Sequence, residues 1–248
     1  MIVFAQFSDT HLDGGPRRAG RAAAVMSCLN DLSRPLDAVL VTGDIANHGR
    51  PSEYEQAREI LAASRAPVFT CPGNHDARSA FRQVLLGEDA AQPADAPVNR
   101  VYHAAGAVFA LCDSTIPGQV DGALAEETIG WLDGVLERWA GRPAFLCFHH
   151  PPRLVRPYHE DLRHLGEDRL PGLLARHSQV AAILCGHAHS PAAATFAGCP
   201  VRVAPGVFST LLLPWDHGDI LDEQAPPGFA LHVLDDDQQL TTHYRFVA

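Results

Sequence analysis

The chain has 248 residues, of which 46% are hydrophobic and 19% are charged, and its formal net charge at pH 7 is −10. This composition is typical of a globular protein that buries a substantial core, and the acidic balance argues against a nucleic-acid-binding surface, which usually carries a basic stripe. No apolar run approaches the roughly 18 residues of a membrane helix, and the N-terminal MIVFAQFSDTHL lacks the features of a secretory signal. We therefore expect a cytoplasmic protein without a membrane partner.

Short apolar runs predict buried strands, and amphipathic stretches between them predict helices. Strands are expected at residues 2–7, 38–41, 67–70, 107–112, 144–148, 180–185 and 201–204, with more strictly alternating runs at 229–234 and 240–247. Helices are expected at 21–32, 52–63, 126–139 and 167–176, the second of them opened by a capping box of Ser52 and Glu55. Strands that alternate with helices indicate an α/β fold with sheets between helical layers. We expect one domain over residues 1–248, with long connections at 87–99 and 214–228.

Polar side chains follow five of the predicted strands directly. In chain order they are Asp9 and His11, then Asp44, then Asn74, His75 and Asp76, then His149 and His150, and finally His187 and His189. In open α/β sheets, ligands bind at the carboxyl ends of the strands. The placement of these residues therefore predicts a shared binding site.

Each of these motifs alone has an ordinary explanation, because a single Asp after a strand is more often a turn or helix-cap residue. GNHD at 73–76 is more specific, since a turn has no use for a His–Asp pair, and five such motifs at strand ends are not expected by chance. Imidazole, carboxylate and amide ligands without thiolate suit Mn, Fe, Zn or Co. The ligands are too many for one ion, which favours two ions about 3.5–4 Å apart that share a carboxylate.

The series DTH, GD, GNHD, HHPP and GHAH resembles the motifs of the calcineurin-like metallophosphoesterases, from Asp9 to at least His189. The HHPP form and the compact length resemble the branch that contains bacterial class III cyclic-nucleotide phosphodiesterases and glycerophosphodiesterases. The resemblance implies a four-layer α/β/β/α sandwich of two mixed sheets flanked by helices. It also implies two metal ions per chain.

The resemblance assigns a role to each motif residue. Asp9, His11 and His189 would hold the first ion, Asn74, His149 and His187 the second, and Asp44 would bridge them. His149 is favoured over His150 as the ligand, which leaves His150 either to support a ligand or to bind substrate in the pocket. His75 would be the catalytic histidine and would bind substrate together with Asn74, and Asp76 would orient His75.

The charge of such a site differs from that of the whole chain. Two divalent ions, two carboxylates and a bridging hydroxide leave about one positive charge, so an anionic phosphodiester can bind to an acidic protein. The ions would lower the pKa of a bound water, hydroxide would attack phosphorus, and His75 would protonate the leaving alkoxide.

Several alternatives stay open at this point. The same centre serves a phosphomonoesterase, a nuclease is disfavoured by the net charge, and a non-catalytic relative would be expected to lack ligands that are all present here. The substrate is expected to be a small phosphoester, but the segments 153–168 and 208–228, with His159, His164 and His217, carry no readable motif. Relatives in this branch often pair, so a homodimer is a further expectation.

The remaining histidines and the cysteines have simpler interpretations. His48, His103, His177, His232 and His243 lie outside the motifs and are expected at the surface or satisfied in the core. The six cysteines show no CxxC spacing and are expected as buried free thiols. The basic cluster at 16–21 is expected to be a solvated start of a helix.

Overall fold

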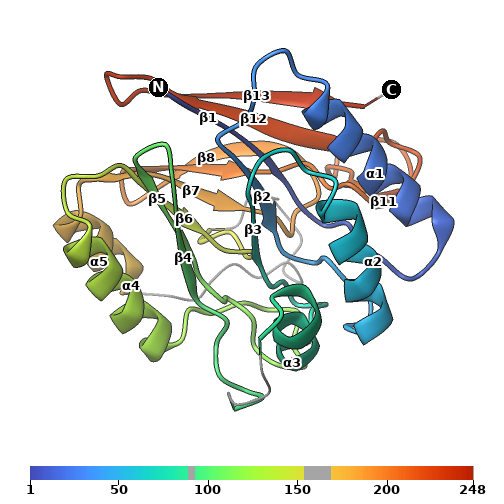
Figure 1. Ribbon diagram of the computed structural model, residues 1–248, viewed down its shortest axis with the longest axis horizontal. Coiled ribbons are helices and arrows are strands. Elements are labelled where there is room, and N and C mark those ends of the chain that lie inside the picture. The colour runs from blue at the N-terminus through green and yellow to red at the C-terminus, as the bar shows by residue number, and fades with distance from the viewer. Residues whose placement is uncertain (89–92, 154–168, 248) are drawn as a thin grey trace.

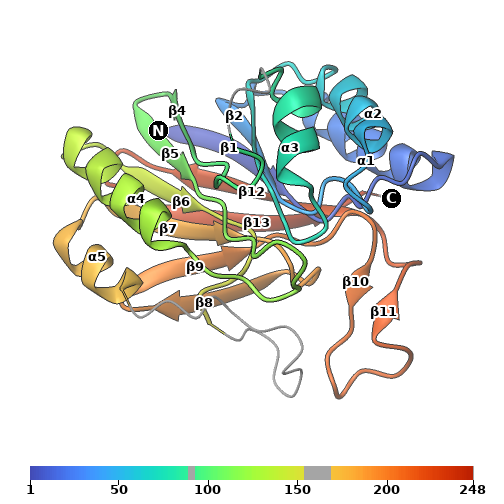
Figure 2. The ribbon, with the colours of Figure 1, turned by 90° about the horizontal axis from the view of Figure 1, so that it is seen from below.

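The computed structural model describes residues 1–88, 93–153 and 169–247, which form two large sheets with helices on their outer faces and one small two-stranded sheet (Figures 1 and 2). None of the described helices is both long enough and apolar enough to cross a membrane. The elements in chain order are β1 Ile2–Phe7, α1 Pro16–Asn30, β2 Ala38–Thr42, α2 Pro51–Leu61, β3 Val68–Cys71, α3 Arg78–Ala80, the π-helical turn η1 Phe81–Leu85, β4 Arg100–Ala104, β5 Ala107–Leu111, α4 Glu126–Arg138, β6 Ala144–Cys147, α5 Leu170–Arg176, β7 Val180–Cys185, β8 Ala192–Phe196, β9 Cys199–Val203, β10 Thr210–Leu211, β11 Leu221–Asp222, β12 Gly228–Leu234 and β13 Leu240–Phe246.

Both large sheets mix parallel and antiparallel strands. The first has the order β13-β12-β1-β2-β3, in which β1, β2 and β3 run parallel to one another. Strand β12 runs antiparallel to both of its neighbours, β1 and β13. The second has the order β4-β5-β6-β7-β9-β8, with β5, β6, β7 and β9 parallel. Parallel strands place their carboxyl ends at one edge, so the loops after β1, β2 and β3 in the first sheet, and after β6 and β7 in the second, lie at corresponding edges.

Three apolar layers fill the spaces between the elements. Helices α1 and α2 pack on the first sheet through a cluster that includes Val25, Met26 and Tyr54. Helices α4 and α5 cover the second sheet through a cluster that includes Leu132 and Leu173. The sheets pack on each other through a third cluster rich in aromatic residues. The predicted four-layer α/β/β/α sandwich is therefore confirmed, with α1 and α2 on one side and α4 and α5 on the other (Figure 1).

Phe4 lies at the middle of the layer between the sheets. Its ring meets those of Phe109 and Phe145 edge-on, at centroid distances of 5.1 and 4.7 Å. Edge-to-face contacts of this kind add to the burial energy of the rings. They join β1 of the first sheet to β5 and β6 of the second.

Some local predictions were wrong. Helix α2 begins at Pro51, and Glu53, rather than Glu55, reaches back to accept the Arg50 backbone N–H at 3.1 Å. The predicted strands are present, but the two-residue strands β10 and β11 and the longer strands β4 and β8 were missed. The sequences of β4 and β8, RVYHA and AAATF, are not continuously apolar. Both lie at edges of the second sheet, where one side of a strand has no neighbour to bury it.

The basic cluster lies at the start of α1 and is partly exposed, as predicted, but its arginines also make contacts that the sequence did not reveal. The helix begins at Pro16, a favoured first position, and its arginines hold the segment that follows β9. Arg21 donates to the backbone carbonyl of Val207 at 2.7 Å, and Arg17 pairs with Glu223 at 2.7 Å. These contacts anchor the base of the β10–β11 hairpin, which projects from the body of the molecule (Figure 2).

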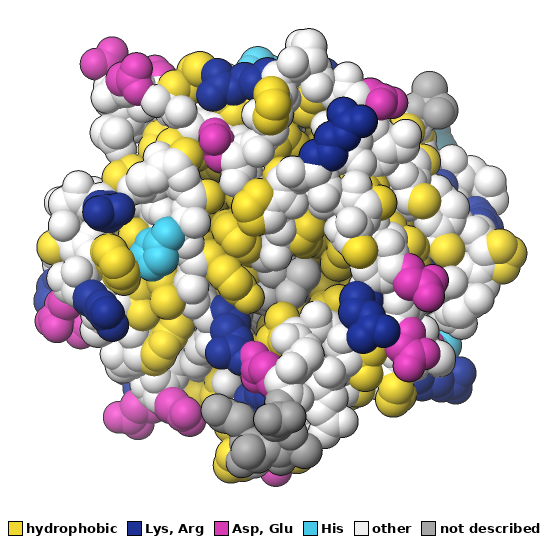
Figure 3. Space-filling view, viewed as in Figure 1, with side chains coloured by type: hydrophobic (Ala, Val, Ile, Leu, Met, Phe, Trp, Pro, Cys, Tyr) yellow, Lys and Arg dark blue, Asp and Glu magenta, His cyan; other side chains and the backbone are white. Residues whose placement is uncertain are grey.

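Charged side chains are distributed rather than gathered on the face drawn in Figure 3. Basic side chains stand singly there among acidic and apolar ones. The face drawn in Figure 3 therefore offers no gathered positive charge to an anion.

Candidate metal centre

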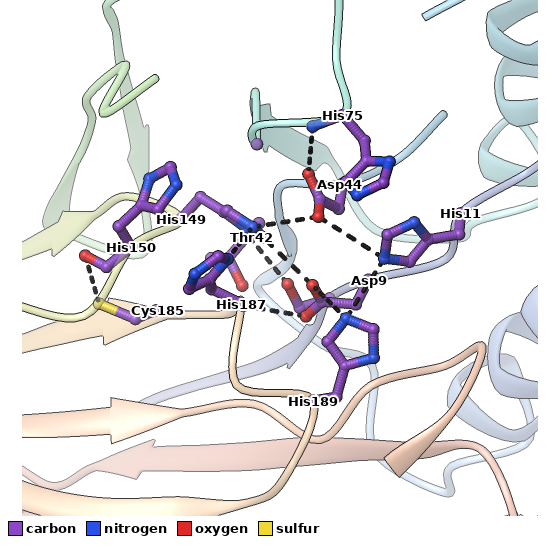
Figure 4. A network of polar contacts seen from close by, with 12 residues as sticks. Asp9, His11, Thr42, Asp44, His75, His149, His150, Cys185, His187 and His189 are labelled. Atoms are coloured by element: carbon purple, nitrogen blue, oxygen red, sulfur yellow. Dashed lines mark hydrogen bonds and ion pairs between the residues drawn. The ribbon is translucent and has the colours of Figure 1, made fainter. Parts of the chain in front are cut away.

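Six motif side chains converge at the edge where strands of both sheets end, namely Asp9, His11, Asp44, His149, His187 and His189 (Figure 4). In the first sheet, the Asp9 backbone N–H donates to Gly43 O at 3.1 Å. In the second, the Gly186 N–H donates to His149 O at 3.0 Å. The His187 N–H crosses between the sheets and donates to Oδ2 of Asp9 at 3.1 Å. Backbone hydrogen bonds therefore fix the loops before any side chain binds a ligand.

Asp9, His11 and His189 form one group of candidate ligands. The two Nε2 atoms of His11 and His189 lie 3.3 Å apart, and Oδ1 of Asp9 lies 3.3 Å from Nε2 of His189. All three side chains are buried. Two imidazole nitrogens and a carboxylate oxygen that face one point are a common ligand set for a divalent ion.

His149 and His187 form the second group, together with Asp44. Nε2 of His149 lies 3.3 Å from Nδ1 of His187 and 3.3 Å from Oδ2 of Asp44. The same Asp44 oxygen is 3.5 Å from Nε2 of His11, in the first group. Oδ2 of Asp44 therefore lies between the two groups, where a bridging carboxylate is needed.

Unpaired buried atoms test whether these residues fit cations. Oδ1 of Asp9, Oδ1 of Asn74 and Nε2 of His187 are all buried and have no hydrogen-bond partner. A buried polar atom without a partner costs about 1–3 kcal/mol. Cations satisfy such atoms, and the oxygen and nitrogen donors match those that Mn, Fe, Zn and Co prefer. The residues fit a pair of cations.

Burial sets the protonation of the site. It lowers the pKa of His11 to about 4 and that of His187 to about 3, so both imidazoles are neutral at pH 7, as metal ligands must be. Burial would raise the pKa of Asp9, but His189 and His149 outweigh it and bring it to about 2. Burial would likewise lower the pKa of His149, but Asp44 raises it to about 9. Cations would therefore displace a proton from His149.

The second nitrogens of two ligands are held by partners that the sequence did not reveal. Nδ1 of His149 donates to the backbone carbonyl of Thr42 at 2.8 Å, and Nδ1 of His189 lies 2.8 Å from Oγ of Ser209. Such contacts orient a ligating imidazole. Ser209 lies in the unreadable segment 208–228, and no motif could have indicated it.

The prediction that Asp76 orients His75 was wrong. Nδ1 of His75 instead donates to the backbone carbonyl of Asn47 at 2.9 Å. The carboxylate of Asp76 turns the other way and accepts the backbone N–H groups of Ile45, Ala46 and Gly73 at 3.1, 3.0 and 2.9 Å. Asp76 thus joins the loops after β2 and β3. Its four neighbours are backbone groups and a tyrosine hydroxyl, which a sequence pattern cannot show.

His150 is not placed to bind substrate. Its side chain is buried, Nδ1 lies 2.8 Å from Oγ of Ser114, and Nε2 lies 3.0 Å from the carbonyl of Val120. With both nitrogens engaged, His150 holds the loop after β5 rather than a ligand. Its adjacency to His149 in the sequence is what suggested a pocket role.

The backbone at the centre is strained. Asp9, His11, Asp44, His187 and His189 all have positive φ, between 44° and 67°. Non-glycine residues rarely adopt this region, and such residues cluster at functional sites.

The motif glycines allow close approach of neighbouring chain segments. A Cβ on Gly43 would lie 2.5 Å from Nδ1 of His149, and one on Gly73 would lie 2.3 Å from Oδ1 of Asp44. Any side chain at either position would displace a candidate ligand.

A chain of buried polar groups lies beneath the centre. Nε2 of Gln6 donates to Oγ1 of Thr42 at 3.0 Å and to the carbonyl of Cys185 at 2.9 Å, which links the two sheets. Oε1 of Gln6 accepts from Nε2 of His232 at 3.0 Å, and Nδ1 of His232 lies 2.9 Å from Oγ1 of Thr242. The amide of Gln6 is therefore bonded at both ends.

Comparison with known proteins agrees with this geometry. The family model described as calcineurin-like phosphoesterase matches residues 2–191, more than three quarters of the chain. The chain belongs to the calcineurin-like phosphoesterase family. It is accordingly a metal-dependent phosphoester hydrolase, as the motif series indicated.

Among individual relatives of this phosphoesterase, a Rhodococcus erythropolis protein named "Probable cyclic nucleotide phosphodiesterase" is 39% identical over 212 residues, 82% of this chain and 68% of the relative. The glycerophosphodiester phosphodiesterase GpdQ of Enterobacter lignolyticus is 31% identical over 250 residues, 93% of this chain and 86% of its own. Among solved structures, a dimetal phosphatase from Danio rerio superposes with a TM-score of 0.73, at 16% identity and with 100% and 96% of the two chains covered. That likeness shows the shared fold.

Histidines outside the motifs have ordinary partners in the phosphoesterase. His48 lies 2.8 Å from Glu53, and His177 lies 2.6 Å from Asp133. His232 is bonded in the core as described above. His159 and His164, in the segment 153–168, lie outside the described residues.

Proposed function

We propose that this phosphoesterase hydrolyses phosphodiesters at a binuclear centre. The observation that supports this most directly is Oδ2 of Asp44, 3.5 Å from His11 and 3.3 Å from His149, between two ligand groups. In the proposal, Asp9, His11 and His189 hold one ion, Asn74, His149 and His187 hold the other, and Asp44 serves both. The ions, when bound, supply positive charge for the phosphate oxygens and acidify a bound water.

His75 is proposed as the proton donor to the leaving alkoxide. Its Nδ1 donates to a backbone carbonyl, which leaves Nε2 for the substrate. Its backbone N–H donates to Oδ1 of Asp44 at 2.8 Å, so the ring is tied to the centre. Its ring packs edge-on against that of His11 at 4.6 Å. Among the candidate site histidines, His75 is the exposed one, as a residue that meets substrate must be.

The substrate class follows from the named relatives. One is named as a cyclic nucleotide phosphodiesterase and another as a glycerophosphodiester phosphodiesterase, and both are diesterases. A phosphomonoesterase with the same centre is the second candidate, since the dimetal phosphatase shares the fold.

A turnover screen of the Mn-loaded protein tests the proposal. The panel contains 3′,5′-cyclic nucleotides, glycerophosphodiesters and simple phosphomonoesters. We expect kcat/KM to be highest for a diester, and a protein that turns over monoesters alone would overturn the diesterase proposal. Full activity after exhaustive chelation would overturn the metal-dependent mechanism. The activity restored to the chelated protein by Mn, Fe, Zn or Co, each added alone, would identify the preferred metals.

We also propose that residues 1–248 act as one domain in the cytoplasm, on a small-molecule substrate and without nucleic acid. Pairing into a homodimer is a further proposal. Light scattering of the purified chain measures its mass, and a value near 26.7 kDa would contradict pairing.

A further inference from the structure

A cavity of about 350 Å³ adjoins the metal centre at Asn74. It is lined by Asn74 and residues 76–79, by residues 94 and 95, and by residues 115–118 of the loop after β5. Its size falls within the range of about 300–1,000 Å³ typical of small-ligand sites. Asn74 is a proposed ligand of the centre, and the backbone N–H of the next residue, His75, donates to Oδ1 of Asp44 at 2.8 Å, so a phosphoester bound at the centre has this cavity beside it.

Arg78 holds two walls of the cavity together. One guanidinium nitrogen donates to the carbonyl of Thr115 at 2.8 Å, another donates to the carbonyl of Asp95, and Nε lies 2.8 Å from Oδ2 of Asp113. Asp113 is fully buried and also accepts the backbone N–H groups of Val98 and Thr115, at 2.9 and 2.8 Å. The cavity is thus formed by fixed loops before any ligand arrives, which lowers the cost of binding.

The charges around the cavity favour some ligands over others. The guanidinium of Arg78 is matched by the carboxylate of Asp113 and has no free charge for a ligand. The carboxylate of Asp95 is exposed beside the cavity and forms no ion pair within the part of the chain that the structure describes. An anionic group would therefore be repelled at the rim, whereas a neutral or cationic group would not.

We propose that this cavity binds the alcohol that stays on phosphorus when a diester is hydrolysed, and that it selects neutral or cationic alcohols. The inference rests on the proposed function above. His75, the proposed donor to the leaving oxygen, does not line the cavity, and its ring packs against that of His11 at 4.6 Å, so the departing alcohol is expected on the His11 side. The retained alcohol is then the one on the Asn74 side.

The test uses two esters with the same leaving group, methyl p-nitrophenyl phosphate and bis(p-nitrophenyl) phosphate. Ile116→Trp places a large ring in the cavity, and the control Gln119→Trp places the same ring on an exposed position of the same loop. Ile116→Trp is expected to lower kcat/KM for the bis ester by about tenfold more than for the methyl ester. Gln119→Trp is expected to leave the ratio of the two unchanged.

If Ile116→Trp lowered kcat/KM equally for both esters, or for neither, the cavity assignment would be overturned and the proposed function would stand. A wild type that turns over neither ester would overturn the proposed function and the inference with it.

The charge preference is tested with choline and carboxymethyl p-nitrophenyl phosphodiesters. The wild type is expected to prefer the choline ester, and Asp95→Asn to reduce that preference. A preference for the carboxymethyl ester would overturn the selectivity.

Discussion

Buried histidines occur in two parts of this phosphoesterase, and their surroundings differ. His232, in β12, is fully buried with both nitrogens bonded to neutral partners, Gln6 and Thr242. His11 and His187 are also buried, but their nitrogens face other imidazoles and carboxylates. Nε2 of His187 has no hydrogen-bond partner among the described residues. The hydrogen-bonding nitrogens of the imidazole are therefore satisfied by neutral groups at His232, and one of them is left without a partner at His187. A buried histidine indicates a ligand site when its nitrogens face other imidazoles and carboxylates instead of neutral hydrogen-bond partners.

The shared carboxylate of Asp44 is the part of the centre whose loss should have the largest effect. Asp44→Ala removes the oxygen between the two groups, so both ions should be lost and activity should fall by about 10³-fold or more. Metal content by elemental analysis and turnover of a diester measure this. Asp133→Asn, on the surface of α4, is the matched control. Two tightly bound ions in Asp44→Ala would contradict the bridging role.

His75 differs from the buried ligands because it is exposed, and its loss should affect chemistry and not metal binding. His75→Ala should retain both ions and lose about 10²–10⁴-fold of activity on alkyl esters, which need a proton donor. The loss on nitrophenyl esters should be much smaller, since nitrophenolate leaves without a proton. His48→Ala, at a neighbouring histidine bound to Glu53, should change neither. Equal losses on both kinds of ester would contradict proton donation.

His232 should make the metal-free protein sensitive to acid. Burial lowers its pKa from 6.5 to about 3, so the unfolded chain binds the proton first as the pH falls. The contribution of His232 is complete above pH 6.5 and is lost as the pH falls from 6.5 toward 3. Between pH 7 and pH 4 the wild type should lose about 3 kcal/mol of unfolding free energy that His232→Gln does not lose. Denaturant titrations at both pH values measure this, and parallel losses would contradict it.

Gln6 connects the buried His232 with the candidate metal centre. Its side-chain amide accepts a hydrogen bond from His232 and donates to groups on β2 and β7, the strands that lead to the candidate ligands. Gln6→Met removes the link between Thr42 and Cys185, and metal affinity should fall by about 10–100-fold, as for other groups that position ligands. Co²⁺ titration followed by absorbance measures this affinity. Thr242→Val, at the far end of the same chain of contacts, should have little effect. An unchanged affinity in Gln6→Met would show that the link does not position the ligands.

The candidate ligands could be predicted to lie together because their types and their positions at strand ends carry the chemical signal. Asp9, Asp44 and His187 each stand directly after an apolar run, and both features are visible in the sequence. The fold class could be predicted for a similar reason, since buried parallel strands have continuous apolar sequences.

The partners of those residues could not be predicted. Asn47 orients His75 through a backbone carbonyl, and every residue has one. Ser209 reaches His189 from a segment without any motif, and His150 was misjudged because only the folded loop shows what occupies its nitrogens.

The sequence by itself determined which atoms are available as ligands and that strands would bring them to sheet edges, because residue type and apolar periodicity are local properties. The tertiary structure alone decided how the two sheets face each other, which oxygen of Asp44 lies between the groups, and where Asp76 and His150 point. Those outcomes depend on distances between residues far apart in the chain, such as the 3.3 Å from His149 to Asp44, and packing fixes such distances only when the whole fold has formed.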